Sequence, residues 1–211
     1  MFPKRLSYLM IFVFVLIPLS VSAGGTHFLV EPYTGVTFNA GYTKEDAVGL
    51  ETGAVLAVGG KFKGFPPRFY LYLKASQSFF GSDDVFVDER QSTGCVRRSY
   101  TGVVGGLRTV IPLFGYLRLN LEVGAGTMFS QNKYIESGRK LAEYEENLTV
   151  VDFGAGLNLR LYRWLSVGIM YDYRFVAEDE YGDMITTILG GSVTDAELGW
   201  SSVTATLGFH F

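Results

Sequence analysis

Cysteine and histidine are scarce in this chain. Its 211 residues include one cysteine, Cys95, and two histidines, His27 and His210. A single cysteine cannot form an internal disulfide, so we expect an unpaired thiol in a surface segment. No cluster of cysteines or carboxylates accompanies the histidines. We therefore expect no metal site and no cofactor.

Apolar runs long enough to cross a bilayer as a helix are also missing. Lys4 and Arg5 precede an apolar stretch from Leu9 to Leu19, and Val-Ser-Ala at 21–23 provides a small-x-small cleavage site. This layout is typical of a secretory signal peptide, whose apolar part is too short to span. We expect residues 1–23 to be removed and residues 24–211 to form one domain, which crosses any membrane as strands.

Positive charge is in deficit as well. Without Lys4 and Arg5 the chain has 16 basic residues against 21 acidic ones. This balance argues against nucleic acid as a partner. Aromatic residues and glycine, in contrast, are plentiful, with 17 Phe, 13 Tyr and 26 Gly.

Strict alternation of apolar and polar residues is the strongest pattern in the chain. In the last eleven residues one face is apolar and the other is small and polar, as in a strand between lipid and a polar interior. The apolar face consists of Val203, Ala205, Leu207, Phe209 and Phe211. Similar alternation predicts eight strands, over residues 30–38, 50–62, 68–79, 99–111, 117–126, 151–161, 165–174 and 201–211.

The predicted connections alternate between short and long. Tight turns fall at 63–67, 112–115 and 162–164, and longer polar loops at 39–49, 81–98, 130–147 and 177–197. An antiparallel up-and-down barrel with both termini at the short-turn side has this arrangement. A soluble barrel would bury its apolar face, whereas here the charges share a face with Gly, Asn, Ser and Thr. The pattern therefore predicts an all-β, eight-stranded, antiparallel transmembrane barrel.

Aromatic residues cluster at the predicted strand ends, as expected for belts at two membrane interfaces. The turn-side belt comprises Phe62, Phe69, Phe114, Tyr116, Tyr162, Trp164 and Phe211. The loop-side belt comprises Phe38, Phe79, Phe129, Phe175 and Trp200.

The inward face carries charges of both signs, which must pair or hold water in a narrow interior. They are Glu31, Lys74, Arg108, Arg118, Glu122, Asp152, Arg160, Asp172 and Arg174. Counting from the tight turns places Arg108 beside Glu122 and Asp152 beside Arg174. Inward glycines such as Gly124 leave room for large groups such as Tyr72. We expect a plug of salt bridges; the alternative is a narrow, weakly conducting pore.

Hydrolysis by serine and histidine needs the two side chains within hydrogen-bond reach and an acid that orients the histidine. His27 and His210 should meet at the short-turn end, and no inward serine is expected within one strand step. We therefore expect no enzymatic activity.

The predicted long loops are acidic, with sixteen acids against seven bases. A solvated surface is one interpretation. The other is divalent-cation bridging between lipopolysaccharide phosphates and either residues 178–180 or residues 143–146.

The strand pattern, the alternating connections and the ending Leu207-Gly208-Phe209-His210-Phe211 resemble those of the small eight-stranded bacterial outer-membrane barrels of the OmpA/OmpX type. The resemblance covers residues 24–211 and includes no peptidoglycan-binding domain. It implies a Gram-negative outer membrane as the location, with lipid and lipopolysaccharide as partners. It also implies an assembly signal at Leu207, Phe209 and Phe211 for the barrel-insertion machinery.

From these features we expect a non-enzymatic structural scaffold whose long loops bind an extracellular or envelope protein. The alternatives, in order, are the small pore and a lipid-modifying outer-membrane enzyme.

Overall fold

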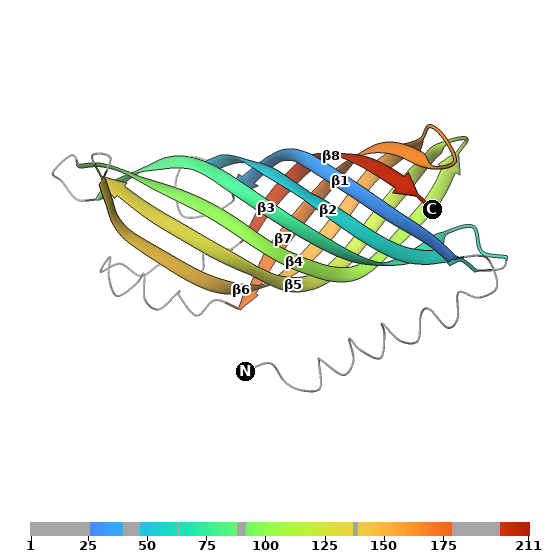
Figure 1. Ribbon diagram of the computed structural model, residues 1–211, viewed down its shortest axis with the longest axis horizontal. Coiled ribbons are helices and arrows are strands. Elements are labelled where there is room, and N and C mark those ends of the chain that lie inside the picture. The colour runs from blue at the N-terminus through green and yellow to red at the C-terminus, as the bar shows by residue number, and fades with distance from the viewer. Residues whose placement is uncertain (1–25, 40–46, 63, 88–91, 137–138, 179–198) are drawn as a thin grey trace.

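A computed structural model describes residues 26–39, 47–62, 64–87, 92–136, 139–178 and 199–211. The expected signal peptide lies outside these residues. The described chain forms eight antiparallel strands in a closed barrel, and each strand pairs with its neighbours in sequence (Figure 1). The strands are β1 (Thr26–Asn39), β2 (Ala47–Lys61), β3 (Arg68–Val87), β4 (Ser92–Phe114), β5 (Leu117–Glu136), β6 (Arg139–Arg160), β7 (Leu165–Glu178) and β8 (Gly199–His210).

The first and last strands close the barrel. β1 and β8 pair from Leu29↔His210 to Asn39↔Trp200. Phe28 and Phe211 add two backbone hydrogen bonds, of 3.0 and 2.9 Å, at the end of this seam. The predicted fold class is thereby confirmed.

The three predicted tight turns are present and lie at one end of the barrel, which we call the short-turn end. They connect β2 to β3, β4 to β5 and β6 to β7. In the β4–β5 turn, Gly115 has a φ of 56°, a backbone conformation that side chains with a Cβ adopt at a cost. The start of β1 and the end of β8 lie at this same end (Figure 1).

Two of the four predicted loops are wrong, because β3–β6 continue far beyond the point where the other strands end. These four strands have 20 to 23 residues, against 12 to 15 in the others. Most of residues 81–98 and 130–147 is therefore paired strand. We call these extensions, at 81–87, 92–98, 130–136 and 139–148, the outer sheet. Residues 40–46 and 179–198, in the other two predicted loops, lie outside the described chain.

The barrel has its apolar face outside and its charges inside. Leu56, Leu73 and Leu157 are 53%, 46% and 49% exposed, whereas Lys74, Arg108 and Arg174 are 3% exposed or less. Such an exterior is stable only against hydrocarbon, because each exposed apolar side chain is unfavourable in water. No helix within the described residues is long and apolar enough to cross a membrane.

The predicted aromatic belts are present with one exception. Phe114, Tyr116, Tyr162 and Trp164 are exposed at the short-turn end, and Phe129 is exposed at the opposite level. Trp200 is 2% exposed and stacks on Tyr100 inside the barrel, so its assignment to the loop-side belt was wrong. It lies an even number of residues from the inward Ser202 and Thr204, and strand alternation turns it inward with them.

Candidate functional site

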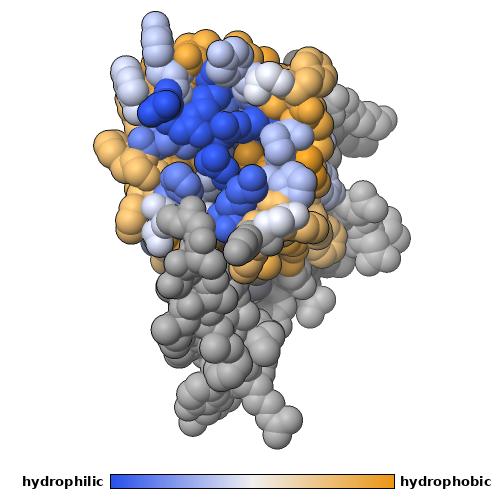
Figure 2. All heavy atoms as spheres, turned by 90° about the vertical axis from the view of Figure 1, so that its right-hand side faces the viewer, coloured by the Kyte–Doolittle hydropathy of each residue, from blue (hydrophilic) through white to orange (hydrophobic). Residues whose placement is uncertain are grey.

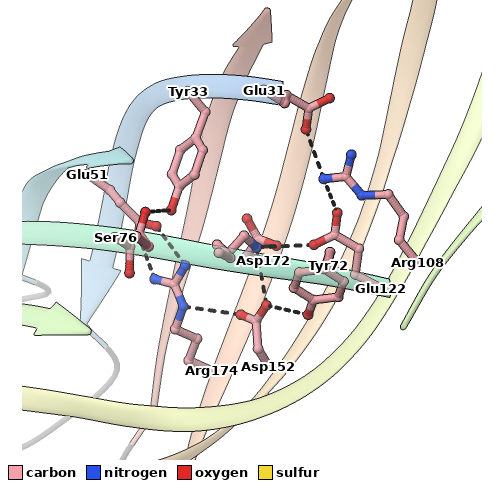
Figure 3. Close-up of polar contacts among 12 residues, drawn as sticks. Glu31, Tyr33, Glu51, Tyr72, Ser76, Arg108, Glu122, Asp152, Asp172 and Arg174 are labelled. Atoms are coloured by element: carbon pink, nitrogen blue, oxygen red, sulfur yellow. Dashed lines mark hydrogen bonds and ion pairs between the residues drawn. The ribbon is translucent and has the colours of Figure 1, made fainter. Parts of the chain in front are cut away.

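A buried group of charged side chains fills the middle of the barrel (Figure 3). We call it the interior charge network; it comprises Glu31, Glu51, Lys74, Arg108, Glu122, Asp152, Asp172 and Arg174. Its members come from β1 to β7, because each strand turns alternate residues toward the axis.

Lys74 forms the centre of the network. Its Nζ lies 2.7 Å from Asp172 Oδ1, 3.2 Å from Asp152 Oδ2 and 3.3 Å from Glu122 Oε2. Oxygens of these three carboxylates lie within 4.8 Å of one another, a spacing that would suit a metal ion. The Lys74 ammonium contacts all three and fills that position with a charge of the protein's own.

Two arginines complete the network on either side of Lys74. Arg108 Nη2 lies 2.5 Å from Glu122 Oε1 and 2.9 Å from Glu31 Oε1. Arg174 forms a bidentate pair with Glu51, with N···O distances of 2.7 and 2.8 Å, and its Nε lies 3.1 Å from Asp152 (Figure 3). Both pairs expected from the turn registers, Arg108 with Glu122 and Asp152 with Arg174, are present.

Glu51 belongs to the network although it was not among the expected interior charges. It lies on the inward face of β2 and is fully buried. In the predicted strand it shares a face with Gly53, and this indicated that orientation. Its partner Arg174 is 123 positions away, and no turn register links them.

Two of the expected interior charges, Arg118 and Arg160, lie outside the network. Both are near the short-turn end, where β5 begins and β6 ends. Arg160 donates hydrogen bonds to the carbonyl oxygens of Tyr162 and Arg163. Arg118 borders two cavities at this end, described below.

Aromatic rings cover the network on the side of the outer sheet. Tyr100 stacks on Trp200 with ring centroids 4.7 Å apart, and Phe80 meets Tyr100 edge-on at 5.5 Å. The Arg174 guanidinium lies 5.9 Å from the Trp200 ring, within cation–π range. Charges and rings together fill the lumen at these two levels.

The inward glycines make room for large neighbours, as expected. A Cβ at Gly124 would clash with the Tyr72 hydroxyl oxygen. That hydroxyl donates to Asp152 over 3.4 Å. The missing side chain therefore allows Tyr72 to reach the network.

A serine–histidine pair lies at the short-turn end, which corrects the expectation that no inward serine is near His210. Ser166 Oγ is 2.8 Å from His210 Nε2, and Ser166 is fully buried on the neighbouring strand. Ser166 lies directly opposite Gly208, and the long His210 side chain spans the remaining two residues. No ion pair between a carboxylate and His210 is found in the described residues.

The terminal residues expected to form the assembly signal lie on the outer face of β8 and just beyond it. Leu207 and Phe211 are 39% and 72% exposed, and Phe209 stacks on Trp164 with centroids 6.4 Å apart. The acidic residues expected to bridge cations are largely outside the described side chains. Two are exceptions: Glu143 Oε1 lies 3.4 Å from Lys133 Nζ, and Glu145 Oε1 accepts a hydrogen bond of 3.1 Å from Gln131 Nε2.

The fold and the inverted polarity define the chain as a barrel of the small eight-stranded outer-membrane type. No family model and no curated protein sequence matches the chain. Among solved structures it is similar to a major outer membrane protein from Thermus thermophilus, with a TM-score of 0.55 and 16% identity over 89% of this chain and 100% of the other.

Two further structures show lower scores. Ail, the attachment invasion locus protein of Yersinia pestis, has a TM-score of 0.49 and 14% identity, covering 89% of this chain and 99% of its own. The N-terminal β-barrel domain of Pseudomonas aeruginosa OprF has a TM-score of 0.48 and 15% identity, with the same coverage. At these identities the likeness concerns the fold, and activity must be argued from the residues of this chain.

Proposed function

We propose that this chain is a non-enzymatic outer-membrane barrel that serves as a rigid scaffold and presents its outer sheet to a protein partner. The observation that carries the proposal is the extension of β3–β6 beyond the barrel. A scaffold that stops at the membrane surface has no need of four strands of 20 residues or more.

As far as the structure describes the chain, the outer sheet has two edges that can accept another strand. β2 pairs with β3 only as far as Phe80, and β7 pairs with β6 only as far as Thr149. Within the described residues, segments 81–87 and 139–148 therefore have one strand neighbour each. Unpaired backbone groups on such an edge bind extended segments of other proteins. We propose a partner that adds a strand here.

The filled lumen favours the scaffold over the pore. At the level of the interior charge network, the charged side chains are at most 5% exposed. A barrel of eight strands has room for side chains and little else. Large, steady current steps from refolded protein in a planar bilayer would favour the pore instead.

The serine–histidine pair supports no hydrolase. An acid that orients the histidine is needed for an active pair, and the cavity beside His210 has a volume of about 10 Å³. An acyl chain does not fit in that volume. Release of fatty acid from lipid substrates by purified protein would contradict this conclusion.

Photo-crosslinking in intact cells tests the interaction proposal. A photoreactive residue in place of Gln131, in the outer sheet, is expected to crosslink to a protein partner. The same residue in place of Tyr162, at the short-turn end, is the control and should not capture that partner. Equal capture from both positions, or capture of lipid alone from position 131, would contradict the proposal.

Export and assembly complete the proposed role. Residues 1–23 act as a signal peptide, and N-terminal sequencing of the mature protein should begin at Gly24. Leu207, Phe209 and Phe211 serve the insertion machinery, and the exposed waist contacts outer-membrane lipid and lipopolysaccharide. Polar replacement of Phe211 should slow insertion in cells; unchanged insertion would argue against an assembly signal there.

A further inference from the structure

Basic side chains gather at the inner wall of the short-turn end. Lys61, Arg68 and Arg118 line a cavity of about 160 Å³ together with Pro66, Val110 and Pro112. In the same measure, one water molecule needs roughly 10–15 Å³, so the cavity is large enough for a hydrated phosphate group. Figure 2 looks onto this end and shows hydrophilic residues in the centre, within a hydrophobic rim.

These basic groups converge from different strands. Lys61 ends β2, Arg68 begins β3 and lies directly opposite Lys61, and Arg118 is the second residue of β5. Arg160, at the end of β6, joins them. Arg68 and Arg118 line the same cavity. Arg118 lies opposite Asn158 on β6, so Arg160 is two residues farther along the same face of the neighbouring strand.

In the part of the chain that the structure describes, no acid pairs with this cluster. Within the described chain, Lys61, Arg68, Arg118 and Arg160 take part in no ion pair. Glu31 borders the small cavity next to Arg118, and its Oε1 pairs with Arg108; within the described residues it forms no ion pair with Arg118. Like charges gathered in one place repel one another, and a bound anion relieves that repulsion.

Snorkelling from the lipid face toward the membrane surface does not explain where these bases lie. Bases that snorkel to the membrane surface do so from the lipid face. Here the lipid face of the same strand ends carries Phe62, Leu159 and Leu161, while the bases line the cavity.

We propose that the basic cavity formed by Lys61, Arg68 and Arg118, with Arg160 beside it, binds a phosphate-bearing anion. Guanidinium groups bind phosphate through paired N–H···O bonds, and the several oxygens of a phosphate satisfy donors that approach from different sides. The phosphate is either that of a lipid headgroup at the membrane interface or that of a soluble compound.

The proposed binding site is closed to anions on the side that faces the middle of the barrel. Above it, the interior charge network holds five carboxylates against three cations. This layer repels an anion, which therefore stops at the basic cavity and does not pass through the barrel.

Binding of two probes to the full chain in a zwitterionic detergent tests the proposal. The probes are inorganic phosphate and a short-chain phosphatidylglycerol below its micelle concentration, followed by phosphorus NMR titration. The R68Q/R118Q variant should lose at least about tenfold in affinity, because two charge-assisted contacts are removed. The control is R163Q, which removes an exposed base from the nearby turn and should bind like the unaltered chain.

The two probes separate the two sources. Tighter binding of phosphatidylglycerol supports a headgroup site, and tighter binding of inorganic phosphate supports a soluble ligand. The proposal is overturned if the unaltered chain binds neither probe, or if R68Q/R118Q binds as well as R163Q. Should R68Q/R118Q fail to fold, R118Q alone is expected to show the loss, and its equal affinity would overturn the proposal as well.

Discussion

Lys74 carries the single ammonium group of the interior charge network and contacts three of its five carboxylates. A charge buried without a partner is far more costly than a buried pair, because its hydration is lost with nothing in return. The bidentate pair between Arg174 and Glu51 and the contacts of Arg108 follow the same logic. Replacing any one cation of the network with a neutral residue should therefore be strongly destabilising, because it leaves buried carboxylates without a partner.

Replacing Lys74 with methionine should destabilise the barrel by about 3–5 kcal/mol, because carboxylates remain buried without their cation. Urea unfolding in phospholipid vesicles measures the change. K133M is the matched control: Lys133 lies 3.4 Å from Glu143 in a pair whose side chains are 41% and 26% exposed. An exposed pair of this kind contributes about 0–1 kcal/mol. Similar losses in K74M and K133M would refute the central role of Lys74.

Whether a side-chain contact could be predicted depended on how far apart its two residues lie in the sequence. Arg108 and Glu122 are joined by one tight turn, so the count from that turn placed them together. Glu51 and Arg174 meet across the lumen from β2 and β7, where their approach depends on the curvature of the whole barrel. His210 and Ser166 escaped notice because a long side chain reaches past its own register position.

The eight strands were predictable from alternation, but only where one face of the strand meets lipid. Beyond its membrane-spanning part a strand has no face against lipid, so its residues need not alternate. The segment Gln131-Asn132-Lys133 is polar throughout, and it was interpreted as loop although it continues β5. Composition distinguishes a membrane-spanning strand from its solvated extension, and it cannot distinguish that extension from a loop.

The barrel should fold without the part of the outer sheet formed by β5 and β6. Replacing residues 131–145 with Asn-Gly joins Ser130 to its register partner Glu146 through a two-residue turn. Because the barrel pairings below this level are kept, the shortened chain should fold and lose no more than about 1 kcal/mol. Electrophoretic mobility of unheated and heated samples, together with urea unfolding, measures this. Failure of the shortened chain to fold would mean that the outer sheet is part of the folding unit.

The lipid around the barrel determines which residues face outward and which face the axis. Leucine, valine and phenylalanine face outward from most of the strands, and the charges face the axis. The same sequence in water would expose its apolar belt and aggregate. This polarity was predictable from the sequence because Gly, Ser, Asn and the charges share one face of each strand.

A charge on the outer waist tests this organisation directly. Leu121 is 41% exposed and lies between Tyr116 and Phe129, which belong to opposite aromatic belts. L121R should cost about 2–4 kcal/mol at the bilayer midplane, measured by folding into vesicles. L161R, at the strand end by the short-turn belt, should cost about 0–1 kcal/mol. An equal effect at both positions would contradict the membrane placement.

The seam between β1 and β8 has a kinetic consequence. Thr37 and Ser201, which are bonded across it, are 164 positions apart in the chain. Contacts of such high sequence separation form late and slowly, because loop entropy is lost before they contribute. Until β8 pairs with β1, the folding chain is an open sheet with two unpaired edge strands. These edges can pair with those of other copies of the chain. Whether the chain avoids aggregation during assembly thus depends on how fast β8 pairs with β1.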